Sequence, residues 1–116
     1  MAVINFKKQP FFNLKGEQMI RIDQVGEKMM EVSLFMNDVV VGNLNREDPD
    51  CTPEERYKRF QIADKIEKAP EEGVSLDIDE IGIIKKVAGK NPSPMVVGRV
   101  WEFLENSIAE KAAKKA

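Results

Sequence analysis

The clearest structural signals of the chain lie in residues 77–101, DIDEIGIIKKVAGKNPSPMVVGRVW. Asp77, followed three residues later by Glu80, has the spacing of a capping box, in which two polar side chains close the first turn of a helix. Apolar residues then recur at helical spacing as far as Gly89, and a glycine is typical of a helix end. We therefore predict a helix over residues 78–88.

A further helix is predicted directly after this one. The sequence Asn-Pro-Ser-Pro at residues 91–94 interrupts the helical pattern. Ser93 can cap a new helix, and Pro94 suits its first position because proline has no N–H to leave unpaired. The expected apolar positions are Val97, Val100, Trp101, Leu104 and Ile108. From about residue 109 the chain consists almost only of Ala, Lys and Glu, and we expect this tail to fray.

A third helix is predicted to begin at residues 52–55, Thr-Pro-Glu-Glu. Thr52 is the expected cap, Pro53 the first helical residue, and Glu55 the acid of a capping box. The charged residues that follow, Arg59 among them, are assigned to a solvated face, and the helix is expected to stop before Pro70. The predicted buried face consists of Tyr57, Phe60, Ala63 and Ile66.

The N-terminal part favours β-structure. Residues 1–23 contain short apolar patches, and residues 11–20 fit two short strands around a turn at Gly16, because glycine tolerates the positive φ that such turns need. Val74–Leu76 is a further candidate strand. The sequence thus predicts a single domain over 1–116, of the mainly α (α+β) class, with about four helices and a small N-terminal β-hairpin.

Residues 25–41 fit two different structures. Their apolar residues recur at spacings of four and three, which is a helical stripe; these are Val25, Met29, Val32, Met36 and Val39. The composition of 32–36 and 39–41 would equally suit strands. We favour a helix from Gln24 to Asp38 because the period persists over four turns, with Gly42 as its C-terminal cap.

Composition excludes several classes of function. The 18 Lys and Arg residues nearly balance the 20 Asp and Glu residues, which argues against a strongly basic nucleic-acid binder. There is no His, which removes most zinc sites and all His-based catalysis. Cys51 is the only cysteine, and the acids around it disfavour a reactive thiolate. We therefore predict no catalytic residue, no metal site, no cofactor and no enzyme.

The same reading indicates a cytoplasmic protein without a membrane span. No apolar run approaches the length of a transmembrane helix, and the N-terminus lacks the apolar core of a signal peptide. A lone Cys51 fits a reducing compartment, since it has no partner for an internal disulfide.

The leading functional hypothesis is a protein-interaction role, with a protein partner or a second copy of the chain. Met29, Phe35 and Met36 are the candidate contact residues, because the predicted helix is apolar on more than one side, and Trp101 would help to anchor the contact. The competing interpretation is that this helix is apolar because it lies at the centre of the domain.

The alternative hypothesis is a small nucleic-acid-binding regulator. Lys85, Lys86 and Lys90 form a cluster, and the helices over 78–88 and 94–108 have the order of a helix-turn-helix motif. The start of the second helix, however, carries one cation and no Asn or Gln to read a base edge, so this alternative ranks second.

Three stretches together resemble short, uncharacterised proteins of tailed-phage and prophage genomes. They are residues 11–16, residues 52–59 leading to 63–66, and residues 79–87 followed by the apolar and glycine positions of 94–105. The resemblance implies a small accessory protein in a host bacterial cytosol, with a role in virion assembly, for example as an assembly chaperone, or in host takeover. It implies no catalytic residues.

Overall fold

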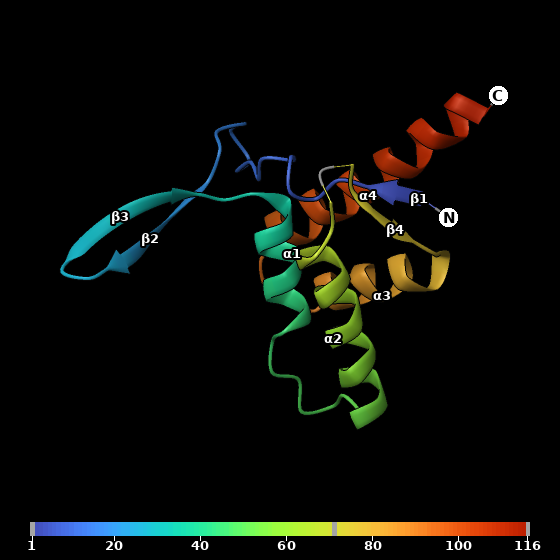
Figure 1. Ribbon diagram of the computed structural model, residues 1–116, viewed down its shortest axis with the longest axis horizontal. Coiled ribbons are helices and arrows are strands. Elements are labelled where there is room, and N and C mark those ends of the chain that lie inside the picture. Colours follow the sequence, from blue (N-terminus) through green and yellow to red (C-terminus); the bar gives the residue numbers. More distant parts are fainter. Residues whose placement is uncertain (1, 71, 116) are drawn as a thin grey trace.

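The computed structural model describes residues 2–70 and 72–115, with side chains for residues 3–24, 26–70 and 72–108. Within these ranges the chain forms four helices and two antiparallel strand pairs (Figure 1). The elements are β1 (Ala2–Ile4), β2 (Ile20–Val25), β3 (Lys28–Ser33), α1 (Met36–Leu44), α2 (Pro53–Glu67), β4 (Val74–Leu76), α3 (Ile78–Gly89) and α4 (Pro94–Lys115). The predicted class, mainly helical with a small N-terminal hairpin, is confirmed.

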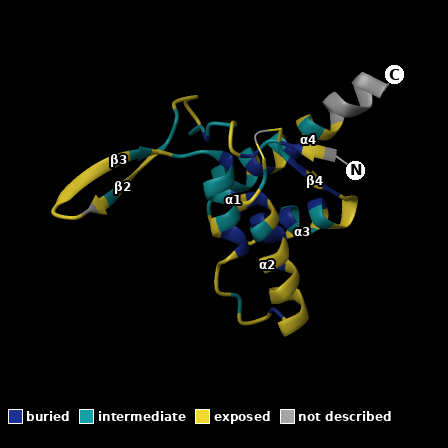
Figure 2. Ribbon diagram, viewed as in Figure 1, coloured by how far each residue is buried: buried dark blue, intermediate teal, exposed yellow. Residues whose placement is uncertain are grey.

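One hydrophobic core unites the helices with the β1–β4 pair. Its largest fully buried side chains are Phe6, Phe11, Ile4, Ile62, Ile66, Leu76, Ile84, Leu104, Val40 and Val100. Figure 2 shows that the buried residues of the helices gather where the helices lie close together. Among the described side chains, none from residues 20–33 belongs to this core, so β2 and β3 lie outside it.

The short β1–β4 ladder ties the start of the chain to the segment between α2 and α3. Ala2 pairs with Leu76 and Ile4 with Val74. Gly73, next to this ladder, has a φ of +111°, and a Cβ atom there would lie 2.7 Å from the carbonyl oxygen of Ile4. The close approach of these two backbones therefore requires glycine at this position.

The predicted starts of α2 and α3 are confirmed, and of these two only α3 has the reciprocal capping box. Thr52 accepts a hydrogen bond from the Glu55 backbone N–H at 3.2 Å, and α2 begins at Pro53. At the start of α3, Asp77 and Glu80 form the reciprocal capping box, with the Glu80 N–H to Asp77 Oδ1 distance at 2.7 Å. These polar side chains satisfy N–H groups that have no partner within the helix.

The predicted buried face of α2 is only partly correct. Ala63 and Ile66 are buried, but Tyr57 is 63% exposed and Phe60 57% exposed. Arg59, assigned to the solvated face, is only 6% exposed. The helix is rotated relative to the prediction because Arg59 turns inward to pair with Asp48, eleven residues away in sequence.

The predicted helix from Gln24 to Asp38 is wrong. This region is a β-hairpin followed by the start of α1 at Met36, and its strands pair from Ile20↔Ser33 to Val25↔Lys28. The two-residue loop has a positive φ of 65° at Gly26 and a negative φ at Glu27, which fits a type II′ turn. A glycine at the first turn position thus outweighs the helical spacing of the apolar residues.

Two other glycine predictions have different outcomes. Gly42 lies inside α1, which ends two residues later at Leu44, so its prediction as a C-cap is wrong. The predicted turn at Gly16 exists, with a φ of +82° and one isolated bridge between Phe12 and Gln18. The regular ladder of the hairpin begins further on, at Ile20.

The α4 backbone is helical to Lys115, beyond the apolar positions predicted for it. Val100 and Leu104 are buried as expected, whereas Trp101 and Ile108 are exposed. The side chains of the tail from residue 109 lie outside the described ones, so its fraying stays a prediction.

Candidate functional site

The β2–β3 hairpin is the most distinctive surface of the molecule, and we call residues 20–33 the arm. Figure 1 shows it extending away from the helical body. The base of the arm is fixed by backbone hydrogen bonds: Phe11 N–H donates to Leu34 at 3.0 Å, and Leu34 N–H donates to Met19 at 2.8 Å. Because Phe11 is buried in the core, these bonds anchor an otherwise exposed hairpin to the body.

The arm exposes large apolar side chains. Ile20 is 48% exposed, Ile22 62%, Met29 67% and Met30 51%. Figure 2 shows that exposure continues along most of the arm. Isolated exposed apolar residues are common on proteins, but several of them on one element with no core of its own indicate a contact surface.

The register of the ladder separates the arm into two unlike faces. Ile20, Ile22 and Met29 share one face, because Ile22 lies opposite Glu31, Met29 lies opposite Gln24, and side chains alternate along a strand. The other face carries Met30, Val32, the exposed Lys28, and an ion pair between Arg21 and Asp23, with Nε and Oδ2 at 3.2 Å. The first of these faces has one charged residue, Glu31, and is therefore the less charged of the two.

Both edges of the arm are open. In the described part of the chain, β2 and β3 form a two-stranded sheet, and no third strand pairs with either. Each outer edge presents a row of backbone N–H and C=O groups that another strand can pair with. Two-stranded hairpins are marginally stable in water, so covering by a third strand or an apolar surface would stabilise the arm.

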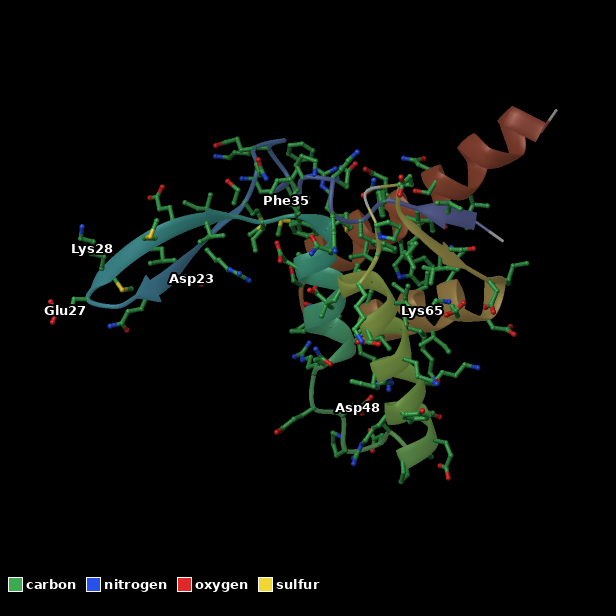
Figure 3. All side chains as sticks on the ribbon, viewed as in Figure 1. Asp23, Glu27, Lys28, Phe35, Asp48 and Lys65 are labelled. Atoms are coloured by element: carbon green, nitrogen blue, oxygen red, sulfur yellow. The ribbon has the colours of Figure 1, made fainter. Side chains whose placement is uncertain are left out.

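The four residues predicted to contact a partner do not share one surface. Met29 lies on the arm, and Phe35 lies half-buried at its base (Figure 3). Met36 is only 2% exposed and belongs to the core, so its assignment to a partner contact is wrong. Its backbone N–H donates to Gln9 at 2.7 Å, which fixes this point of the chain against the N-terminal segment.

Trp101 lies on α4 beside α3, and it is engaged within the fold. Its indole Nε1 donates to the Lys85 carbonyl oxygen at 3.1 Å, and Lys85 Nζ lies 5.1 Å from the ring centroid. Lys85 also pairs with Glu105 at 3.4 Å. The indole therefore packs two helices together, and Trp101 is separate from the arm.

The predicted lysine cluster is partly neutralised. Lys90 Nζ lies 2.6 Å from Asp48 Oδ2, while Lys86 is exposed and has no ion pair with a described residue. The hydrogen bond from Lys90, aided by Asp50 N–H and Arg59, lowers the pKa of Asp48 to about 2. With Lys85 paired to Glu105, two of the three lysines already contact carboxylates, which weakens a phosphate-binding role.

Cys51 is buried, at 5% exposure, which keeps its thiol away from solvent. Among the described residues, no group of three His, Cys, Asp or Glu side chains is placed so as to hold a metal ion. In the same part of the chain, no helix combines the length and apolarity needed to cross a bilayer.

Comparisons of this chain with protein-family models, curated proteins and solved structures give no match. The resemblance to phage and prophage proteins therefore stays a prediction.

The sequence predictions did not include the arm, although the sequence carries a signal for it. Gly26–Glu27 lies between two stretches in which apolar and polar residues partly alternate, which is typical of a two-residue hairpin.

Proposed function

We propose that this chain is a non-enzymatic interaction protein that binds a protein partner, or a second copy of itself, through the arm. The observation that carries the proposal is the exposure of Ile20, Ile22 and Met29 on one face of a hairpin with two open edges. Apolar surface of this kind is stabilised when it is removed from water, and the helical body leaves it uncovered.

The mechanism combines backbone pairing with burial of side chains. A six-residue strand spans about 20 Å, so a partner strand can form a regular ladder along either edge. Backbone hydrogen bonds supply affinity in this mode, and alternate side chains supply specificity. A specific contact buries about 600–800 Å² per partner.

The biological setting that we propose follows from the sequence resemblance. A small accessory protein of a phage or prophage would act in the host cytosol, and it would assist virion assembly by holding a protein component through the arm. An arm that adds to another sheet needs no catalytic group, which fits a chain without His and with a buried Cys51.

The test replaces one of two exposed isoleucines with glutamine, one on the arm and one on the helical body. Ile22→Gln alters the apolar face of the arm, whereas Ile78→Gln alters an isoleucine that is 88% exposed at the start of α3. Sedimentation over a range of protein concentrations should show association that Ile22→Gln weakens and Ile78→Gln preserves. Affinity capture from the host cell, with the same two variants as baits, extends the comparison to other partners. A monomer at every concentration, with identical proteins captured by both variants, contradicts the proposal.

The alternative proposal is that the chain binds nucleic acid, and retention on DNA tests it. If the chain binds DNA, its retention on DNA should fall steeply as the salt concentration rises. Lys86→Gln should reduce this retention and Ile22→Gln should not. That result would favour nucleic-acid binding over protein binding through the arm. Lys86 is the informative position because Lys85 and Lys90 are paired with carboxylates within the fold.

A further inference from the structure

A second candidate site lies away from the arm, where the loop between α1 and α2 crosses the first turns of α2. A cavity of about 620 Å³ is bordered there by Leu44, Arg46, Asp48, Arg56, Arg59 and Phe60, among others. A smaller pocket of about 180 Å³ adjoins it, sharing Arg46, Asp48 and Arg59 and adding Asn43 and Lys90. Figure 3 shows Asp48 well away from Glu27 and Lys28 at the arm tip.

The central group of this site is a buried guanidinium. Arg59 is 6% exposed, and its one ion pair with a described residue joins Nη1 to Asp48 Oδ2 at 3.2 Å. The same oxygen of Asp48 also receives Lys90 Nζ at 2.6 Å. One carboxylate oxygen is therefore shared by two cations, and most N–H donors of the Arg59 fork remain available to another acceptor.

The cavity walls add further positive charge. Arg46 is exposed, lines both cavities and makes no side-chain hydrogen bond or ion pair with a described residue. Arg56 reaches only a backbone oxygen, with Nη2 at 3.4 Å from the Asp48 carbonyl. The described residues that line the two cavities include four cations and two carboxylates, so the lining has an excess of positive charge; they are Arg46, Arg56, Arg59, Lys90, Glu47 and Asp48.

An unpartnered buried donor belongs to the same wall. Asn43 is 7% exposed, and its Nδ2 has no hydrogen-bond partner. The amide orientation follows from its neighbours: Ser93 N–H donates to Asn91 Oδ1 at 2.9 Å, so Asn91 Nδ2 must donate to Asn43 Oδ1, at 3.0 Å. A buried N–H without an acceptor is uncommon, and Asn43 places this one beside the smaller pocket.

We propose that these adjoining cavities bind a phosphate-type oxyanion, either free or as part of a small molecule with an apolar or aromatic body. The planar guanidinium groups match the oxygens of phosphate, and three arginines line these cavities beside two carboxylates. Leu44 and Phe60 give the larger cavity an apolar wall against which such a body packs.

Two probes test the proposal: inorganic phosphate and phenyl phosphate, each against sodium chloride at the same ionic strength. Both phosphates should raise the Tm in a saturable manner, because a ligand that binds only the native state stabilises it. Phenyl phosphate should bind more tightly than inorganic phosphate if Leu44 and Phe60 contribute. Equal affinities would remove the apolar part of the proposal, and a Tm rise no larger than that with chloride would remove all of it.

The matched variants are Arg46→Gln and Lys28→Gln, each of which removes one exposed positive charge. Calorimetric titration should show Arg46→Gln weakening the Kd by roughly tenfold, since a hydrogen bond to a charged group contributes about that factor. Lys28→Gln, at the arm tip, should leave the Kd unchanged. Equal Kd values for the two variants would show that phosphate binding depends only on the net charge of the protein, and would contradict the proposed site.

Discussion

At the scale of single residues, Asp48 is the group on which the loop between α1 and α2 depends. It contacts Arg59 and Lys90 through one oxygen, and its other oxygen accepts Asp50 N–H at 3.1 Å. These contacts hold its pKa at about 2, below the usual 3.8. A carboxyl group with a lowered folded-state pKa stabilises the fold above its unfolded pKa, and this contribution is lost as pH falls through the folded pKa.

We therefore expect Asp48→Asn to lower the free energy of unfolding near neutral pH, because it also leaves Arg59 without its buried partner. The difference from the wild type should shrink as pH falls from about 4 toward 2, where Asp48 itself becomes protonated. Urea unfolding at several pH values measures this. Asp50→Asn, in the same loop, is the control, and a gap that stays constant with pH would contradict the assignment.

Two glycines give a second prediction at this scale, because their replacement by alanine should change the stability of the fold in opposite directions. Gly73→Ala should destabilise the fold by about 1–3 kcal/mol, because its φ is +111° and the new Cβ would meet Ile4. Gly82→Ala lies within α3, with nothing within 4 Å, and should stabilise the fold by about 0.5–1 kcal/mol. Chemical denaturation measures both, and a change of the same sign in both variants would contradict the argument.

At the scale of elements, the sequence predicts what depends on a few adjacent residues. The starts of α2 and α3 follow from Thr52 and Asp77 because their caps act within one turn. The buried face of α2 could not be predicted in the same way. It depends on Arg59 meeting Asp48 and, through it, Lys90, which is 42 residues from Asp48 in sequence.

The residues of the candidate sites were likewise predictable only in part. Met29 was predicted as a contact residue and lies on the arm, but for a reason different from the one proposed, since the helix expected there is a hairpin. The stripe from Val25 to Val39 joined an exposed hairpin to the first turns of α1, which spacing alone cannot distinguish. The arginine-lined cavity depends on three-dimensional proximity and had no sequence signal.

The arm's turn provides a prediction for one element. Gly26→Val should destabilise the hairpin by about 1 kcal/mol or more, because a β-branched residue is strained at a φ of +65° while no atom obstructs its Cβ. Amide hydrogen exchange should become faster in residues 20–33 and stay unchanged in the core helices, because the arm lies outside the core. Gly42→Ala, on exposed α1 surface, is the control. Faster exchange throughout the molecule would show that the arm supports the fold as a whole.

At the scale of the whole molecule, the arm and the arginine-lined cavity are separate parts of a body whose longest dimension is 51 Å. The core connects all four helices but includes no described residue of the arm (Figure 2). The arm meets the body at its base, where backbone hydrogen bonds of Phe11 and Leu34 hold it, and no arm residue lines the cavity. We therefore expect a change in one part to have little effect on the other.

This separation predicts additivity between Ile22→Gln on the arm and Arg46→Gln at the cavity. Association should respond to the first change alone and phosphate binding to the second alone. The stability of the double variant should equal the sum of the two single effects within about 0.5 kcal/mol, because the two side chains share no partner. Urea unfolding of the four proteins, with and without phosphate, completes the cycle. A larger interaction energy, or phosphate binding that changes with association, would show that occupancy of the cavity controls the arm.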